Sequence, residues 1–412
     1  MIVRYEPWGA WVKLEREAAL VAIDRDGARA LGLDAGPLWD DAPSNRDGAR
    51  DEHPSATSSS AKAAAPSRPL EVHLAVTSRC AAGCEGCYLD ARPDGIEPPR
   101  AEIERRFDAL AKAGAFTVAF GGGEPTLRDD LGDLADAASA RGITPVVTTS
   151  GLGVGDRKVR HLQRFAQVNV SYDGPGDAYA SVRGYDGASA AEATIAKLVR
   201  AGVKVGVNVV LTRATFPELA ATLRRAFELG AREAQLLRYK PAGRAKNLDY
   251  LARRLAPEQA RSLGPILRSI ARELPDLRVR IDCALVPFLS ADPDLAARPG
   301  ELARWGVLGC EAGAALAATR VDGTVLPCSF AGATAIDVAE LAGSGWDRDP
   351  VLEAFRAFPA RPPEPCASCT LRTVCRGGCK VVAEFVDGAI GPDPECPRVR
   401  AHRAGNKART AP

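Results

Sequence analysis

The sequence lacks any long run of apolar side chains, although 46% of its 412 residues are hydrophobic. No stretch approaches the roughly 20 apolar residues of a membrane-spanning helix, and the N-terminus lacks the basic, apolar and cleavage regions of a signal peptide. An excess of charge of one sign is also missing, because the formal net charge is only +2. We therefore expect a cytoplasmic protein with no bias towards membranes or nucleic acid.

Disulfide bonds are not expected either. The chain has 11 cysteines, an odd number, and the cytosol keeps thiols reduced. Three of them lie within residues 80–87 and seven within residues 310–396, whereas Cys283 stands alone. Cysteines that only fill a core would be scattered along the chain. Their clustering predicts metal centres.

The ends of the chain differ in composition from its middle, and the length predicts more than one domain. Residues 2–23 alternate like a β-hairpin and residues 26–33 read as a short helix, so we expect residues 1–40 to form an N-terminal arm. Residues 41–69 contain almost no large apolar side chain, which predicts a flexible linker. The basic residues 401–412 are predicted to be a disordered tail.

From residue 70 onwards, short apolar strands alternate with amphipathic helices. Such a series implies parallel strands joined by right-handed crossovers. The strands are expected at residues 71–77, 116–120, 145–149, 168–172, 203–211 and 234–238, with a later helix at 257–273 and strand at 278–281. No glycine fingerprint of a dinucleotide-binding fold opens the first helix. The predicted fold class is α/β, with residues 70–290 forming a partial (β/α)6 barrel of the TIM type whose chemistry lies at the strands' carboxyl ends.

The first cysteine group follows the first strand, as Cys80, Cys84 and Cys87 in a C-x3-C-x2-C loop. Thiolates are the ligands of iron–sulfur clusters, and three of them leave one iron of a four-iron cubane without a protein ligand. An open coordination position is where a cofactor or substrate binds. The alternative is a zinc site with a fourth ligand from elsewhere, but the nearest histidine, His73, lies within the predicted strand.

Glycine and polar residues end the next three strands. The second strand ends in the glycines Gly121, Gly122 and Gly123 followed by Glu124, and glycine allows close backbone approach to a ligand. The third ends at Thr149 and the fourth at Ser171, which is followed by Arg183, whose guanidinium group suits a carboxylate. Each motif alone would be an ordinary strand-to-helix turn or a surface arginine. Their recurrence at successive strand ends favours a binding site.

The second cysteine group lies within residues 300–400. Its members are Cys310, Cys328, Cys366, Cys369, Cys375, Cys379 and Cys396. Seven thiolates exceed one tetrahedral site, so two metal centres are expected there. Paired structural zinc ions are the alternative to iron–sulfur clusters.

Together these motifs resemble the radical S-adenosylmethionine (radical SAM) enzyme family, in its SPASM-domain subfamily, over residues 70–400. The resemblance implies a 4Fe–4S cluster on the first cysteine group, whose open iron binds S-adenosylmethionine. It implies cofactor contacts from Tyr88, Gly121, Gly122, Gly123, Glu124, Thr149, Ser171 and Arg183. It also implies an electron donor such as a flavodoxin or ferredoxin, and reductive cleavage that yields a 5′-deoxyadenosyl radical able to remove hydrogen from a substrate.

The same resemblance implies two auxiliary iron–sulfur clusters. It assigns Cys366, Cys369, Cys375 and Cys396 to a distal cluster, and Cys310, Cys328 and Cys379 to a proximal one. No motif assigns the fourth proximal ligand. Cys283 either ligates, lies inert in the core as free cysteines commonly do, or donates a hydrogen atom. Whether these clusters pass electrons or bind substrate is left open.

Members of this subfamily commonly modify side chains of peptides or proteins, so the resemblance implies a peptide or protein substrate. The N-terminal arm then resembles the remnant of a domain that binds a leader peptide by strand addition, or is a simple packing arm. Ser329 stands where sulfatase maturases carry an aspartate, so formylglycine formation is not expected. The alternatives are a small-molecule substrate and a non-catalytic iron–sulfur or zinc scaffold.

Overall fold

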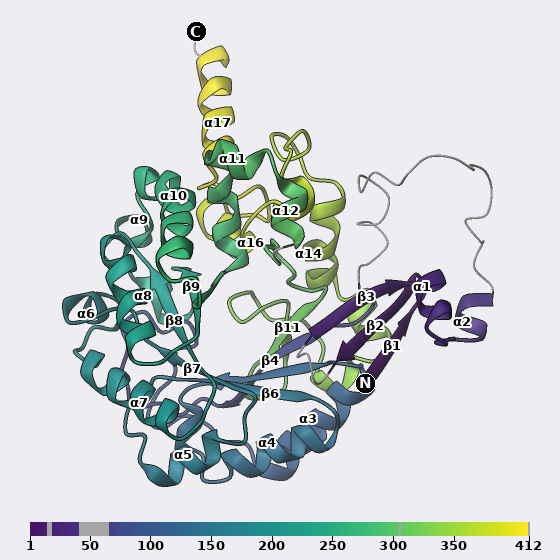
Figure 1. Cartoon of the computed structure of the whole chain (residues 1–412). Helices are drawn as coiled ribbons and strands as arrows, with labels where there is room; N and C mark the ends of the chain where they lie inside the picture. Colours follow the sequence, from purple (N-terminus) through teal and green to yellow (C-terminus); the bar gives the residue numbers. More distant parts are fainter. Residues whose placement is uncertain (15–18, 41–65, 305, 411–412) are drawn as a thin grey trace.

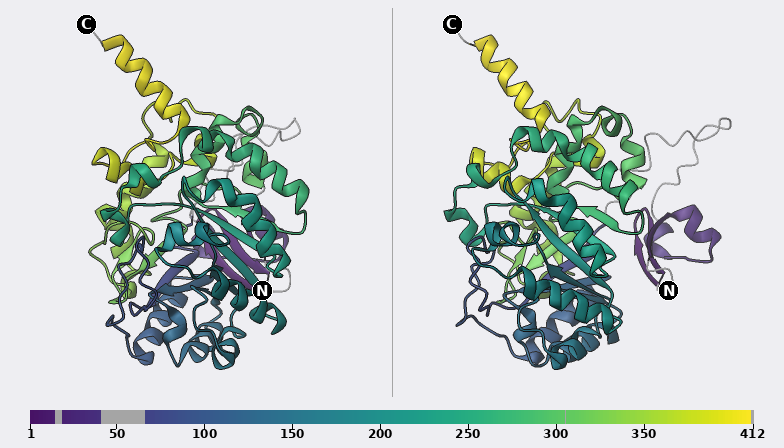
Figure 2. Two further views of the ribbon diagram at one scale, coloured as in Figure 1. Left: turned by 90° about the vertical axis from the view of Figure 1, so that its left-hand side faces the viewer. Right: turned by 60° about the vertical axis from the view of Figure 1, so that its left-hand side comes forward.

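In the computed structural model the described residues are 1–14, 19–40, 66–304 and 306–410, so most of the predicted linker lies outside them. They form an N-terminal module, a curved α/β body and a cysteine-rich C-terminal region at one end of that body (Figures 1 and 2). None of the described helices has both the length and the apolar character needed to cross a bilayer.

The N-terminal module, residues 1–40, is a three-stranded antiparallel sheet with two short helices, where a hairpin and one helix were predicted. Its strand order is β1–β2–β3. The elements are β1 (Ile2–Glu6), β2 (Gly9–Leu14), β3 (Ala19–Asp24), α1 (Arg25–Ala30) and α2 (Pro37–Asp40). The Trp39 side chain is 2% exposed and its indole N–H donates to the Glu6 carbonyl at 2.8 Å, which closes the module's small core.

The body is built on a nine-stranded sheet of order β10–β9–β8–β7–β6–β5–β4–β11–β12. Its strands are β4 (Glu71–Thr77), β5 (Thr117–Gly122), β6 (Thr144–Thr149), β7 (Gln167–Ser171), β8 (Val205–Leu211), β9 (Glu233–Arg238), β10 (Arg278–Ile281), β11 (Leu316–Thr319) and β12 (Val325–Leu326). Strands β4 to β10 are parallel and adjacent in chain order. The predicted α/β fold with a partial barrel is confirmed, with β10 as a seventh strand in succession.

Helices cover the outer face of this sheet (Figure 1). They are α3 (Arg100–Lys112), α4 (Leu131–Ala140), α5 (Asp156–Leu162), α6 (Asp177–Arg183), α7 (Ala188–Arg200), α8 (Leu219–Glu228), α9 (Tyr250–Arg253) and α10 (Pro257–Glu273), with 3-10 turns η1 (Pro125–Leu127), η2 (Phe216–Glu218) and η3 (Gly243–Asn247). Helix α3 buries Ile103, Phe107 and Leu110, which share one face at helical spacing. It stops before Gly114, whose φ of +73° favours glycine.

The C-terminal region is joined to the barrel through the sheet. Strand β11 pairs in parallel with β4, with Leu316 opposite Glu71. The Ser329 hydroxyl also lies 2.9 Å from the Nδ1 atom of His73, in β4. The remaining elements are η4 (Cys283–Ala291), α11 (Pro293–Ala296), α12 (Pro299–Arg304), η5 (Val338–Glu340), α13 (Ser344–Arg348), α14 (Pro350–Ala360), α15 (Arg372–Cys375), α16 (Lys380–Asp387) and α17 (Pro397–Thr410).

The predicted disordered tail is wrong for residues 401–410, which belong to helix α17. The helix begins at Pro397, whose fixed φ suits a first helical position. Val399 in its first turn is 1% exposed, and the Arg403 guanidinium pairs with the Asp387 carboxylate at 2.6 Å. The basic composition of residues 401–412 did not indicate either the buried Val399 or the ion pair of Arg403 with Asp387.

Candidate active site

The loop after β4 brings the three predicted cysteines together. Cys80 lies within electrostatic range of Cys84, Cys87 and the Glu124 carboxylate. Burial raises the pKa of the Cys80 thiol, and these neighbours raise it further. The three cysteines are all partly exposed, so the loop lies at an open end of the barrel.

Backbone N–H groups point at two of these sulfur atoms. The Ala82 N–H donates to the Cys80 sulfur at 3.5 Å, and the Ala91 N–H donates to the Cys87 sulfur at 3.4 Å. Hydrogen bonds of this kind stabilise a thiolate that ligates a cluster and tune its reduction potential. The loop is therefore folded around its sulfur atoms.

Glycines are required where β5 meets this loop. A Cβ atom on Gly122 would lie 2.1 Å from the Thr77 carbonyl oxygen, and one on Gly123 would lie 2.1 Å from the Arg79 carbonyl oxygen. Gly121 has room for a side chain, because the nearest atom to its Cβ position is 3.9 Å away. Glycine is therefore required at positions 122 and 123 because the backbone there packs closely against the end of β4 and the start of the cysteine loop.

Glu124 joins the ends of β5 and β6. Its side chain is 6% exposed and accepts five hydrogen bonds, from the backbone and hydroxyl of Thr126, the hydroxyl of Thr149, and the backbone and hydroxyl of Ser150, at 2.7–3.1 Å. The predicted pair Glu124 and Thr149 therefore lies together. Protein donors surround the carboxylate, so it acts as a fixed negative charge beside Cys80.

Arg183 and Ser171 also lie at the carboxyl ends of the strands. Ser171 is 8% exposed at the end of β7. Arg183, at the end of α6, pairs with the fully buried Asp173 at 2.6 Å. Burial lowers the pKa of Arg183, but Asp173 and Cys84 outweigh burial and raise it overall. Arg183 is thus a fixed cation beside the cysteine loop and not a surface arginine.

Tyr88 lies between the cysteine loop and the C-terminal region. Its ring centroid is 4.8 Å from that of Phe330, and the ammonium of Lys240 lies 4.2 Å from the Phe330 ring centroid. Burial raises the pKa of Tyr88 to about 12, with a further contribution from Cys87. The sequence analysis assigned no role to Phe330 or Lys240.

The distal set, defined as Cys366, Cys369, Cys375 and Cys396, lines a single cavity. Pro287 and Ser290 of η4 are among the other residues that line it. Among the described residues, no three His, Cys, Asp or Glu side chains are close enough to hold one metal ion. A tetrahedral zinc ion bonded at about 2.3 Å needs sulfur atoms about 4 Å apart. The four cysteines thus line one cavity without forming a single-ion site.

The proximal set, defined as Cys310, Cys328 and Cys379, belongs to one buried cluster of side chains. Cys328 lies within electrostatic range of both Cys310 and Cys379. The Cys283 and Cys310 thiols lie close enough to shift each other's pKa, which Cys310 raises for Cys283 and Cys283 lowers for Cys310. Cys283, isolated in the sequence, therefore lies near the proximal set in the structure.

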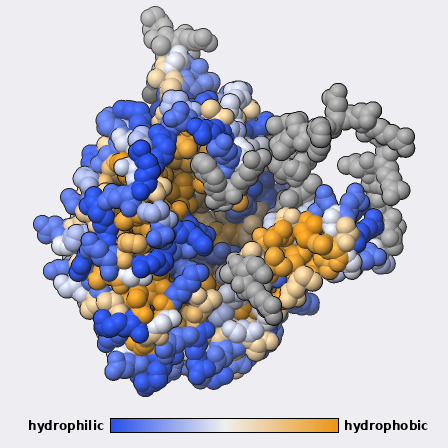
Figure 3. Space-filling view, in the orientation of Figure 1, coloured by the Kyte–Doolittle hydropathy of each residue, from blue (hydrophilic) through white to orange (hydrophobic). Residues whose placement is uncertain are grey.

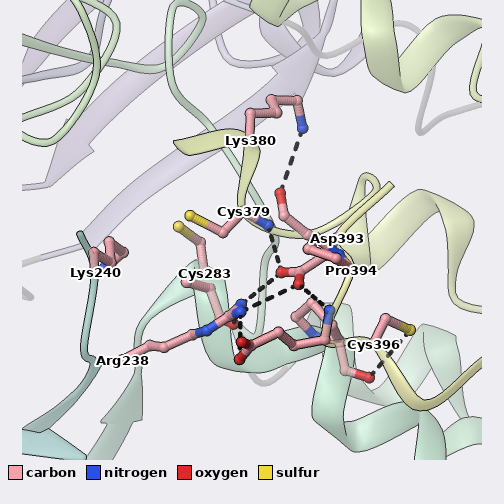
Figure 4. A network of polar contacts seen from close by, with 12 residues as sticks. Arg238, Lys240, Cys283, Cys379, Lys380, Asp393, Pro394 and Cys396 are labelled. Atoms are coloured by element: carbon pink, nitrogen blue, oxygen red, sulfur yellow. Dashed lines mark hydrogen bonds and ion pairs between the residues drawn. The ribbon is translucent and has the colours of Figure 1, made fainter. Parts of the chain in front are cut away.

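A buried ion-pair network that sequence reasoning missed joins the two halves of the chain (Figure 4). The guanidinium of Arg238, at the end of β9, is 2.5 Å from the Asp393 carboxylate and 2.9 Å from that of Glu395. Asp393 also accepts the Cys379 N–H at 3.0 Å. Asp393 and Glu395, the two acidic residues just before Cys396, are the only sequence feature that could have indicated a cationic partner here.

Comparison with known proteins gives matches along most of the chain. Residues 74–226 match the family model of the Radical SAM superfamily. The PqqA peptide cyclase of Ruegeria pomeroyi is 27% identical over 355 residues, which cover 81% of this chain and 88% of that protein. The mycofactocin maturase MftC of Mycolicibacterium smegmatis is 28% identical over 344 residues, with 80% and 82% covered.

Solved structures share the fold. Streptococcus suis SuiB bound to its precursor peptide SuiA has a TM-score of 0.71 at 18% identity, covering 96% of this chain and 98% of that one. The anSMEcpe structure with bound AdoMet has a TM-score of 0.62 at 18% identity, covering 83% and 100%. The family match spans the cysteine loop and the four strand ends described above. Residues 74–226 thus form a domain of the Radical SAM superfamily, and the similarity to radical SAM peptide cyclases and maturases extends over about four fifths of the chain.

Proposed function

We propose that this enzyme is a maturase that modifies a side chain of a ribosomally made peptide or protein. The observation that carries the proposal is the C-x3-C-x2-C loop at the carboxyl end of a partial barrel, in a chain whose relatives over about four fifths of its length are named peptide cyclases and maturases. Its many unpaired thiols suit a reducing cytoplasm.

The cysteine loop fits a 4Fe–4S cluster with one iron left open. Cys80, Cys84 and Cys87 would hold it, because three thiolates leave one iron of a four-iron cubane without a protein ligand. Such a cluster supplies reductive cleavage of S-adenosylmethionine and hydrogen abstraction from the substrate. The electron for this step comes from a flavodoxin or ferredoxin.

The protein's own contribution is to position the cofactor and exclude water. Arg183 provides a fixed cation for the cofactor's carboxylate, and Ser171 a hydroxyl at the same end of the sheet. Glu124 keeps β5 and β6 together beside Cys80. Tyr88, which is packed on Phe330, lies towards the C-terminal region and would lie against the adenine of the bound cofactor.

The C-terminal cysteines are proposed to hold two auxiliary iron–sulfur clusters. The distal set supports this because its four cysteines line one cavity. The proximal set supports it because its thiols gather in one buried cluster that lies close to the Tyr88–Phe330 contact. Both centres would lie on the side of the barrel that the C-terminal region covers.

The N-terminal module is proposed to bind a leader peptide by strand addition to β3. Strand β3 pairs only with β2 among the described residues, so its outer edge carries unpaired backbone groups. Leu20 and Val21 on this strand are 39% and 38% exposed, and Figure 3 shows an apolar patch on the module. Exposed apolar side chains at a free edge favour a peptide partner.

The function is tested by anaerobic reconstitution with iron, sulfide, dithionite and S-adenosylmethionine. We expect release of 5′-deoxyadenosine, and a mass change in a precursor peptide encoded by a short reading frame beside the gene. The variant Cys80→Ala/Cys84→Ala/Cys87→Ala is the control and should release no nucleoside. Zinc in place of iron, or undiminished release from this variant, refutes the radical chemistry. Nucleoside release with no peptide change points to a small-molecule substrate.

Leader binding is tested separately, by fluorescence anisotropy of the labelled precursor. The double variant Leu20→Glu/Val21→Glu should bind at least about tenfold more weakly, because two charges replace apolar contacts at the β3 edge. Leu31→Glu changes a residue that is 68% exposed in the same module but outside the sheet, and should bind as the wild type does. Equal affinity of all three proteins contradicts strand addition at β3.

A further inference from the structure

The concave face of the barrel sheet lines an open space. In β5 and β6 the residues of one face are buried, whereas those of the other face, such as Ala119 and Thr148, are partly exposed. Asn169 in β7 and Asn208 in β8 follow the same alternation. The helices cover the outer face of the sheet (Figure 1), so the partly exposed side chains point into the barrel. A substrate inside the barrel would therefore contact this face.

His73 lies on this concave face, near the middle of β4. It is the only histidine in the nine described strands of the sheet. Its neighbours Val72 and Leu74 are fully buried on the opposite face, whereas the His73 side chain is 39% exposed. Because β4 lies between β5 and β11, this exposure is towards the barrel interior and not at an edge of the sheet.

Both ring nitrogens of His73 have a hydrogen-bond partner. Nε2 lies 3.0 Å from the Glu71 carboxylate, and Nδ1 lies 2.9 Å from the Ser329 hydroxyl. Burial raises the pKa of Glu71, but its interactions with His73 and Arg280 outweigh burial and leave the pKa below its ordinary value. An ionised carboxylate only accepts, so Nε2 carries the proton and Nδ1 of the neutral ring accepts the Ser329 O–H.

The order hydroxyl, imidazole, carboxylate suits a proton transfer. The imidazole can take the proton of the hydroxyl, while the carboxylate orients the ring and stabilises the imidazolium that forms. Such a chain of hydrogen bonds acts on a molecule that contacts the hydroxyl. In this protein that hydroxyl belongs to Ser329, which is partly exposed.

Ser329 lies beside the candidate active site. The next residue is Phe330, whose ring packs on Tyr88 of the cysteine loop with their centroids 4.8 Å apart. Ser329 and His73 are 256 positions apart in the sequence, so their contact exists only because the C-terminal region is folded against the barrel. The hydrogen-bonded chain therefore joins the barrel interior to the region that packs on the cysteine loop.

A bond formed between two peptide side chains requires the substrate to lose two hydrogen atoms in total. One leaves as a hydrogen atom, which is transferred to the 5′-deoxyadenosyl group of the cleaved cofactor. The other leaves as one electron and one proton. The electron passes to an oxidised iron–sulfur cluster, whereas the proton needs a base within hydrogen-bond reach of the substrate.

We propose that His73 is the base that receives this proton, through the hydroxyl of Ser329, which touches the substrate. The Ser329 oxygen takes the substrate's proton as its own O–H bond breaks, and the released proton moves to Nδ1 of His73. The imidazolium is then paired with the Glu71 carboxylate, which is a positioning residue. The inference rests on the proposed function, because it takes the substrate to be a peptide that the enzyme oxidises.

The test counts 5′-deoxyadenosine and modified peptide in the same reaction of the reconstituted full chain. Hydrogen abstraction precedes proton loss, so His73→Gln should keep nucleoside release within about twofold while modified peptide per nucleoside falls at least about tenfold. Glutamine retains hydrogen-bonding groups but takes up no proton at neutral pH. The matched control is His161→Gln, in the outer helix α5, which should leave the peptide yield per nucleoside unchanged.

Imidazole distinguishes a base from a residue that only supports the fold. In His73→Ala, added imidazole should restore part of the modified peptide, whereas it should not change the yield of the wild type. The proposal is overturned if His73→Gln keeps the wild-type yield per nucleoside, or if imidazole does not raise the yield of His73→Ala. A wild type that releases nucleoside without modifying peptide would instead refute the proposed function.

A second readout needs no turnover. Diethyl pyrocarbonate reacts with unprotonated histidine nitrogens, and mass spectrometry locates the modified residue. Ser329→Ala removes the hydrogen bond to Nδ1, so His73 should react faster in this variant than in the wild type, while His161 should react equally in both. Equal rates at His73 contradict the hydrogen-bonded arrangement on which the proposal depends.

Discussion

Replacing Arg238 with methionine should loosen the C-terminal region from the barrel. The Arg238 side chain is 3% exposed, and the carboxylates of Asp393 and Glu395 beside it are 1% and 2% exposed. Removing one partner of a buried ion pair costs about 3–5 kcal/mol, since a charge is left without compensation. We expect the lower part of that range, because Glu395 keeps a second cation, Arg254, at 2.8 Å.

Amide hydrogen exchange measures this loss of local stability at the residues of the ion-pair network. Each 1.4 kcal/mol is tenfold in an opening equilibrium, so 3–5 kcal/mol corresponds to about 100-fold to 4,000-fold faster exchange. The informative amides are those of Cys379 and Glu395, which both donate to the Asp393 carboxylate at 3.0 Å. Mass spectrometry of peptides spanning residues 379–396, under conditions where exchange follows the opening equilibrium, provides the assay.

The same chemical change on the neighbouring strand is the control. Arg280 in β10 pairs with Glu233 at 3.3 Å, but its side chain is 61% exposed. Exposed pairs contribute about 0–1 kcal/mol, so Arg280→Met should change exchange by no more than about fivefold. If Arg238→Met exchanges no faster than Arg280→Met, the buried network does not hold the two regions together and our reasoning is wrong.

Two other predictions concern the barrel. Gly122→Ala places a Cβ atom 2.1 Å from the Thr77 carbonyl oxygen, at the end of β4 where the cysteine loop begins, so iron content and S-adenosylmethionine affinity should fall at least about tenfold. Gly155→Ala, in open space, should match the wild type in metal analysis and calorimetry. Burial raises the pKa of Glu192, but hydrogen bonds from Arg225 and Tyr172 outweigh it and leave the pKa below its ordinary 4.5. Ionised Glu192 therefore stabilises the fold above that value, and the advantage over Glu192→Gln in thermal midpoint should vanish as the pH falls from about 6 to 3; an advantage that grows in acid contradicts this.

The sequence was sufficient to predict the barrel strands because their signals are local. Each is a short apolar run that ends in glycine or polar residues. The helix predicted at residues 257–273 has the same bounds as α10, and Pro257 marks its first position. Strands β11 and β12 were missed. They have only four and two residues, and β11 exists as a strand because it pairs with β4, almost 250 residues earlier.

The candidate site also contains local contacts, which the sequence could predict, and long-range contacts, which it could not. Cysteine spacing alone groups the thiols of the first loop, because they are close in sequence, whereas the grouping of Cys396 with Cys366, Cys369 and Cys375 was implied only by the family resemblance. The contact between Cys283 and Cys310 and the pair of Arg238 with Asp393 join segments far apart in the chain. A single sequence contains no pattern for such contacts, since each depends on how η4 and the C-terminal region fold against β9.

The pairing of β11 with β4 has a consequence for biosynthesis. The strand that leads into the cysteine loop keeps an uncovered edge until residues 316–319 have left the ribosome and folded. During most of translation the barrel is therefore incomplete on the side where its iron must be delivered. Cluster insertion into the first loop and completion of the sheet by the last quarter of the chain are events that the cell has to order in time.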